Sequence, residues 1–221
     1  MSILKADLPS LNALLPRGVQ LDEQSLAKLK IYLTFLTKWN KAINLTGPKD
    51  ADRIFNELIL DSFYLAQFLQ TLPLAENPKC YDLGAGAGLP GIPLRLVWSM
   101  GSYTLIEIKT KRALFLAQVL ANLKLLNTFY YQGSFQDYFK SKNKSADLIV
   151  SRAFWPWPKL ASHIEPILAP KGIWIVLTKN PYAEASLAKL ELIASQSYQL
   201  ANSTRFFWAL KAKDPKPNSD N

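Results

Sequence analysis

The chain has 221 residues, and 49% of them are hydrophobic, which is enough for the core of one α/β domain and an added helical segment. Its formal net charge of +9 favours a polyanionic partner such as nucleic acid, with a basic solvated surface as the alternative. A single cysteine and a single histidine exclude an intrachain disulfide and the usual metal clusters, and no run is long and apolar enough for a membrane span, so we expect a cytoplasmic protein without metal.

The N-terminal third is predicted to be helical. Residues 22–41 carry apolar side chains at helical spacing, and Asp22 is placed to cap the start of that helix. A second helix is expected from about residue 50 to residue 70, after the break at Gly47. We therefore expect residues 1–72 to form a helical extension.

After a proline-bounded linker, strand and helix patterns alternate along the chain. Expected strands cover residues 79–84, 102–108, 128–133, 146–152, 172–178 and 205–212, and expected helices cover 89–100, 110–126, 158–168 and 181–195. Such alternation predicts βαβ units in a mainly parallel sheet, and the runs at 198–203 and 205–211 predict a final antiparallel pair. Residues 73–213 would form this domain, followed by a polar tail at 214–221.

The motif Asp82-Leu-Gly-Ala-Gly-Ala-Gly-Leu89 follows the first expected strand. Gly84 and Gly86 let the backbone approach a ligand closely, but Leu89 occupies the third glycine position of the dinucleotide fingerprint. A ligand without phosphate tolerates that leucine, which favours S-adenosylmethionine. Glu107 ends the next apolar run, where a carboxylate holds ribose hydroxyls. The alternative is an ordinary glycine-rich turn followed by a surface acid.

Further candidates lie where the third and fourth strands are expected to end. Phe135 and Gln136 would face an adenine, although core packing explains Phe135 equally well. Arg152 is followed by Phe154 and Trp155, and guanidinium planes and aromatic rings stack on splayed RNA bases. The alternative is that the aromatic side chains anchor a rigid turn.

Lys109, Lys111 and Arg112 cluster at the start of a helix, where the helix dipole disfavours cations, so we expect them to contact RNA phosphates. The sequence offers no general base in a nucleophilic triad, and we assign no catalytic residue. Methyl transfer to an atom with a free lone pair, such as guanine N7, requires no prior proton removal and fits this absence.

Several of these segments resemble the RsmG (GidB) family of bacterial 16S rRNA guanine-N7 methyltransferases. The similar segments are residues 39–46, 60–62, 84–93, 111–116 and 151–154. The resemblance implies a class I methyltransferase fold, with a Rossmann-like, mainly parallel sheet and an antiparallel last strand. It also implies S-adenosylmethionine as methyl donor and 16S rRNA in the small ribosomal subunit as partner. We expect the protein to be a monomer. The cofactor contacts it implies are Gly84, Leu89, Phe135, Gln136 and Arg152.

Four positions depart from the family pattern. Glu57 and Leu58 stand where the family has an Arg-His pair, Thr178 precedes Lys179 where the family has Lys-Gly, and Gln136 stands where an acid is frequent. The departures at Glu57, Leu58 and Thr178 leave open a catalytically weakened relative that binds RNA or ribosomal particles. A small-molecule methyltransferase on the same fold is a further alternative.

Overall fold

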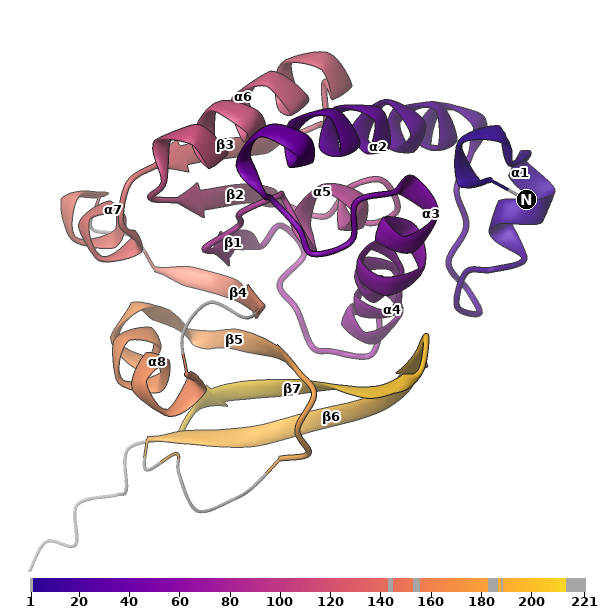
Figure 1. Cartoon of the computed structure of the whole chain (residues 1–221). Coiled ribbons are helices and arrows are strands. Elements are labelled where there is room, and N and C mark those ends of the chain that lie inside the picture. The colour runs from indigo at the N-terminus through magenta and orange to yellow at the C-terminus, as the bar shows by residue number, and fades with distance from the viewer. Residues whose placement is uncertain (1, 143–144, 153–155, 183–186, 188, 214–221) are drawn as a thin grey trace, which may run out of the picture.

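A computed structural model describes residues 2–142, 145–152, 156–182, 187 and 189–213. Its centre is a seven-stranded sheet in the order β3-β2-β1-β4-β5-β7-β6 (Figure 1). The strands are β1 (Lys79–Leu83), β2 (Ser102–Glu107), β3 (Thr128–Gln132), β4 (Ala146–Arg152), β5 (Leu168–Thr178), β6 (Leu190–Leu200) and β7 (Ser203–Ala212). Strands β1 to β5 are parallel, and β7 runs antiparallel between β5 and β6. This confirms the predicted class I methyltransferase arrangement.

The N-terminal extension is helical, as predicted. Its elements are the short turn η1 (Ile3–Lys5), α1 (Leu8–Asn12), α2 (Glu23–Ile43), α3 (Ala51–Ile54), the π-helical turn η2 (Phe55–Ile59) and α4 (Leu60–Leu69). Asp22 caps α2 as expected, because its carboxylate accepts the backbone N–H of Ser25 at 2.6 Å. Asp50 caps α3 in the same way. The single helix expected over residues 50–70 is therefore a run of three helical segments.

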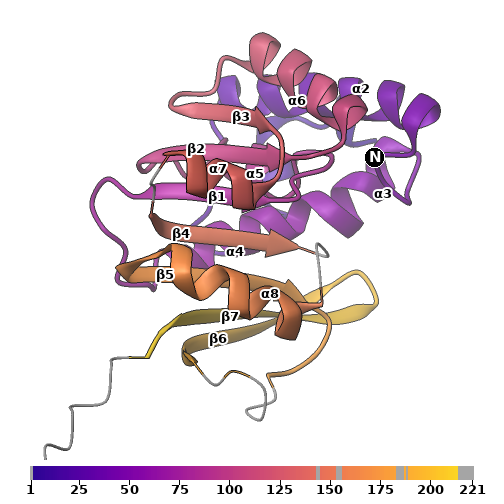
Figure 2. The same ribbon diagram turned by 90° about the vertical axis from the view of Figure 1, so that its left-hand side faces the viewer.

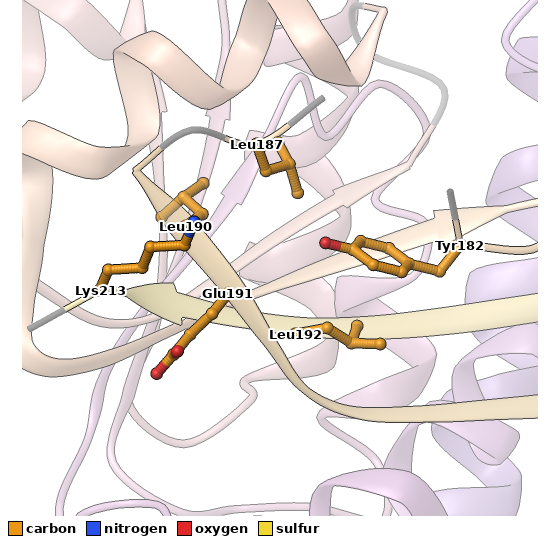
Figure 3. Close-up of a pocket in the computed structure, with 6 residues that line it drawn as sticks. All are labelled: Tyr182, Leu187, Leu190, Glu191, Leu192 and Lys213. Atoms are coloured by element: carbon orange, nitrogen blue, oxygen red, sulfur yellow. The ribbon is translucent and has the colours of Figure 1, made fainter. Parts of the chain in front are cut away.

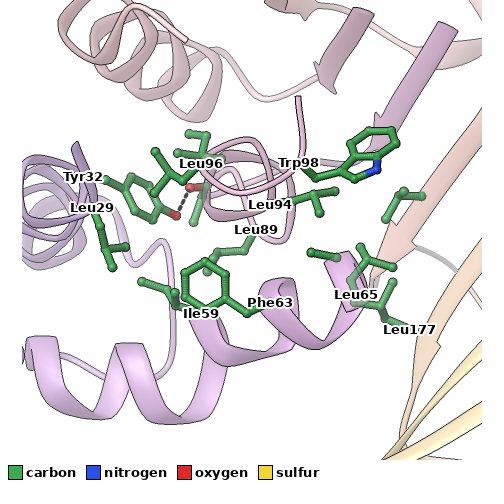
Figure 4. Packing of buried hydrophobic residues seen from close by; sticks show 14 of the residues in the cluster. Leu29, Tyr32, Ile59, Phe63, Leu65, Leu89, Leu94, Leu96, Trp98 and Leu177 are labelled. Carbon is green, nitrogen blue, oxygen red and sulfur yellow. Dashed lines mark hydrogen bonds between the residues drawn. The ribbon is translucent and has the colours of Figure 1, made fainter. Parts of the chain in front are cut away.

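Helices cover both faces of the sheet (Figure 2). One face packs against α2, α4, α5 (Gly91–Leu94) and α6 (Thr110–Leu123), and the other packs against α7 (Phe135–Lys142) and α8 (Trp157–Ile164), which continues into the turn η3 (Glu165–Ile167). Successive strand residues alternate between these layers, so Cys80 joins the first core and Tyr81 the second. The extension shares the first core with the sheet: Figure 4 shows Ile59 and Phe63 packed beside Leu89.

Three elements differ from expectation. The helix expected over 89–100 is only the short α5, and α7 was not expected. Ser134 directly precedes α7, and its hydroxyl accepts the N–H of Asp137. The helix expected over 181–195 is absent from the described residues of that range, and residues 190–195 belong to β6, where pairing with β7 overrides local helix propensity. Residues 183–186 and 188 lie outside the described chain. Within the described residues, no helix is long and apolar enough to cross a bilayer.

Candidate cofactor and acceptor site

The glycine loop lies at the carboxyl end of β1, beside β2. The backbone N–H groups of Gly84 and Ala85 both donate to the carbonyl of Ile106, at 2.9 and 3.0 Å. Gly84 and Gly86 have φ values of +68° and +55°, a conformation that favours glycine. The loop is therefore folded back against the second strand and presents bare backbone at the sheet edge.

Glu107 ends β2 and holds this loop. Its Oε2 accepts the N–H of Gly86 at 2.9 Å, and its Oε1 accepts the N–H of Lys109 at 2.7 Å. The side chain is only 3% exposed. Because each carboxylate oxygen has two lone pairs, both oxygens keep acceptor capacity for the hydroxyls of a ligand. Glu107 thus joins the glycine loop to the start of α6 and remains suited to a ribose.

Asp82 lies beneath the loop, not at its surface. The residue is 1% exposed, and its carboxylate accepts the N–H of Gly91 at 3.1 Å. Burial raises the pKa of Asp82 to about 7, against the opposing effects of that hydrogen bond and of the Arg152 charge. A Cβ on Gly91 would lie 2.8 Å from Asp82 Oδ2, so glycine is required for this close approach. Asp82 therefore supports the loop from below.

A cavity of about 190 Å³ opens between the ends of β1, β2 and β3. It is lined by Gly84, Ile106, Ile108, Gly133, Ser134, Phe135 and Gln136. The structure therefore brings Phe135 and Gln136 to the same cavity as the glycine loop. Phe135 is also part of the core under α7 and is 3% exposed, so its packing and cavity-lining roles coexist.

Arg152 leaves β4 directly beside the glycine loop. Leu83 pairs with Ser151 in the β1–β4 ladder, so Gly84 and Arg152 are the next residues of adjacent strands. The Arg152 Nη1 donates to the carbonyl of Leu58 at 3.1 Å and lies 3.4 Å from Asp61 Oδ2. Arg152 therefore connects the cofactor edge to the π-helical turn and α4 of the extension.

A second cavity, of about 390 Å³, lies at the carboxyl ends of β4 and β5. It is lined by Leu58, Asp61, Arg152, Leu177, Thr178, Lys179, Tyr198 and Arg205. Tyr198 and Arg205 were not among the site residues predicted from the sequence, and Asp61 was named only inside a segment similar to the family. Three of the four departures from the family pattern bear on this region: Leu58 and Thr178 line the cavity, while the neighbouring Glu57 pairs with Arg53 at 2.8 Å.

The three predicted basic residues at the start of α6 differ in their exposure. Lys109 and Lys111 are exposed, whereas Arg112 is half-buried against the glycine loop. The Arg112 Nη1 lies 3.7 Å from the point where a Cβ on Gly86 would stand. Phe154 and Trp155, the predicted aromatic contacts, lie outside the described residues.

Helix α2 also contacts the glycine loop. The buried hydroxyl of Tyr32 donates to the carbonyl of Ala87 at 2.8 Å, drawn as a dashed line in Figure 4. A further cavity of about 550 Å³ lies at the β6 edge, lined by residues that include Tyr182, Glu191 and Lys213 (Figure 3). It contains none of the predicted site residues and lies three strands beyond β4 in the sheet order.

The chain is similar to known proteins in sequence and in fold. The family model for rRNA small subunit methyltransferase G (GidB) matches residues 25–213. The chain belongs to this family. A protein of Lawsonia intracellularis named ribosomal RNA small subunit methyltransferase G is 43% identical over 195 residues, covering 88% of this chain and 90% of that protein. A protein of the same name from Oleidesulfovibrio alaskensis is 37% identical, covering 89% and 90%.

Two solved structures share the fold of this GidB family member. A putative methyltransferase, yhhF, from Escherichia coli has a TM-score of 0.51 at 17% identity, covering 68% of this chain and 84% of that chain. A mutant of MtNAS solved in complex with S-adenosylmethionine has a TM-score of 0.56 at 13% identity, covering 86% and 78%.

Proposed function

We propose that this chain transfers a methyl group from S-adenosylmethionine to N7 of a guanine in 16S rRNA of the small ribosomal subunit. The observation that carries the proposal is the pair of cavities at the carboxyl edge of the sheet, one lined by Gly84 after β1 and the other lined by Arg152 at the end of β4. The strand order reverses between β1 and β4, and open α/β sheets bind ligands at such a switch point. Membership of the GidB family supports the choice of donor and RNA.

The cofactor would lie across the glycine loop. Phe135 and Gln136 would contact the adenine in the cavity of about 190 Å³. Glu107 would accept the ribose hydroxyls, and Gly84 and Gly86 would allow the chain of the cofactor to pass over the backbone. Leu89 adds an apolar contact, and Arg152 stands where the methyl-bearing end would face the second cavity. The cofactor supplies an electrophilic methyl group on a sulfonium.

The protein's task would be to position the acceptor. Guanine N7 carries a free lone pair, so the chain need not remove a proton, and holding N7 in line with the methyl group supplies the rate enhancement. Lys109, Lys111 and Arg112 would contact RNA phosphates near the loop, and Phe154 and Trp155 would stack on RNA bases. We propose that the enzyme acts as a monomer in the cytoplasm, where ribosomal subunits are assembled.

The test uses purified protein, S-adenosylmethionine labelled in the methyl group, and two substrates: free 16S rRNA and small subunits from a strain that lacks the modification. Label in a single guanosine at N7 is the expected result. Arg152→Ala should abolish methyl transfer while the circular dichroism spectrum is retained. The charge-matched control Lys171→Ala, exposed at the start of β5, should leave methyl transfer unchanged. Cofactor binding without transfer to either substrate would refute the proposal and favour the weakened relative.

A further inference from the structure

Asp61 gathers the polar groups of the second cavity. The residue is 1% exposed and lies on the first turn of α4, immediately after the π-helical turn. Its Oδ1 accepts the hydroxyl of Tyr198 at 2.8 Å. Its Oδ2 lies 3.4 Å from Arg152 Nη1 and 3.5 Å from Arg205 Nη1. One buried carboxylate therefore joins α4 to β4, β6 and β7.

This shared carboxylate leaves the cavity positively charged. Three cationic side chains, Arg152, Lys179 and Arg205, line the cavity together with the single carboxylate of Asp61. A buried carboxylate that pairs with one cation is neutralised, but one shared by two guanidinium groups leaves an excess of positive charge. Such a cavity is complementary to an anionic ligand, and a nucleotide of RNA carries the required phosphate.

Each guanidinium is held at a second point. Arg152 Nη1 donates to the Leu58 carbonyl at 3.1 Å, and Arg205 Nε donates to the hydroxyl of Ser203 at 3.1 Å. Within the described chain, these bonds and the Asp61 contacts leave Nη2 of both guanidinium groups without a hydrogen bond. Planar guanidinium groups fixed in this way can present the remaining N–H donors to phosphate oxygens.

The position of Asp61 is itself constrained by packing. The Tyr198 ring stacks on Phe207 with ring centroids 4.5 Å apart, and on Tyr64 with centroids 4.7 Å apart. Tyr198 is thus held between α4 and β7 while its hydroxyl donates to Asp61. Because these aromatic contacts fix the donor, they also fix the carboxylate to which it is bonded.

We propose that this cavity receives the acceptor nucleotide and that Asp61 is a positioning residue, which holds Arg152 and Arg205 at the cavity wall so that their free N–H groups bind the phosphate of that nucleotide. The proposal rests on the proposed function, because it assigns the RNA side of the same reaction. It gives Asp61 no chemical step. Asp61 acts through the two arginines.

The test is a double-mutant cycle on the full chain, with Asp61→Asn, Arg205→Gln and the double variant compared by kcat and KM for small subunits. Asp61→Asn should lower kcat/KM about a hundredfold, the effect of misplacing bound groups by about 1 Å. Because Asp61 acts through Arg205 as well as Arg152, the double variant should lose less than the product of the two single losses. Losses that multiply in the double variant would overturn the proposal, as would an unchanged kcat/KM in Asp61→Asn.

Two further measurements separate positioning from folding and from failure of the proposed function. Tyr198→Phe removes one hydrogen bond and no charge, so the same cycle with Arg205→Gln applies if Asp61→Asn does not fold. Arg205→Gln should reduce the slope of log RNA affinity against log salt by about one, because it removes one phosphate contact. An unchanged slope would refute the phosphate contact, whether or not the wild-type protein transfers a methyl group. Absence of methyl transfer by the wild-type protein, with the slope reduced as expected, would count only against the proposed function.

Discussion

The buried carboxyl of Asp82 should make the stability of the protein depend on pH. Burial raises its pKa from an ordinary value of 3.8 to about 7 in the folded protein. Because the folded-state pKa is raised, the group favours folding fully only below pH 4, and this contribution is lost as the pH rises toward 7. A shift of about three pKa units corresponds to roughly 4 kcal/mol. About half of this difference should appear by pH 5.5, and the curve should level above about pH 8.

Asp82→Asn is the matched variant for this test. An asparagine can still accept the N–H of Gly91 through its side-chain oxygen, and it carries no charge at any pH. The free energy of unfolding, measured by urea denaturation of both proteins between pH 4 and 8.5, should converge at low pH. It should diverge by roughly 4 kcal/mol at high pH, with the variant more stable. A difference that stays constant over this range would refute the reasoning, because it would mean that Asp82 ionises normally in the folded protein.

Three further variants test the support of the glycine loop. Gly91→Ala places a Cβ 2.5 Å from Leu105 Cδ2 and should lower the free energy of unfolding by about 1–3 kcal/mol in urea denaturation; unchanged stability would show that the loop can shift freely. Tyr32→Phe removes the donor to the Ala87 carbonyl and should lower the free energy of unfolding by about 1 kcal/mol and weaken S-adenosylhomocysteine binding measured by calorimetry. Unchanged affinity would show that the contact between α2 and the loop does not affect cofactor binding. Glu107→Gln replaces one carboxylate oxygen, which accepts a backbone N–H, by an NH2 donor, and should weaken S-adenosylhomocysteine binding about tenfold. Wild-type affinity in this variant would exclude Glu107 from the cofactor site.

Residues that interact within one βαβ unit could be predicted from the sequence. Gly84, Gly86 and Glu107 lie within 24 positions of one another, and the strand–glycine–helix pattern places them at one sheet edge. The parallel strands were also predictable, because their buried residues form short, nearly continuous apolar runs. The local pattern was less informative for β6, where the pairing with β7 determines an extended conformation.

The acceptor side of the site could not be predicted in the same way. Asp61 contacts Tyr198 and Arg205, which are 137 and 144 positions away in the sequence. No periodicity or motif spacing encodes such contacts, since they depend on how the final hairpin packs against α4. The same applies to Arg112, whose approach to the glycine loop depends on the first turn of α6. Among the groups that contact the Asp61 carboxylate, Arg152 was anticipated, because it ends a predicted strand.

The hydrogen bond from Tyr32 to Ala87 makes the extension a participant in ligand binding. Any ligand that orders the glycine loop is linked through this bond, and through the shared core, to the stability of α2. Binding at the loop should therefore slow amide hydrogen exchange in α2, more than 40 positions earlier in the sequence. The rate of amide exchange in α2 would then depend on whether the methyl donor is bound. The π-helical turn of the same extension contacts Arg152.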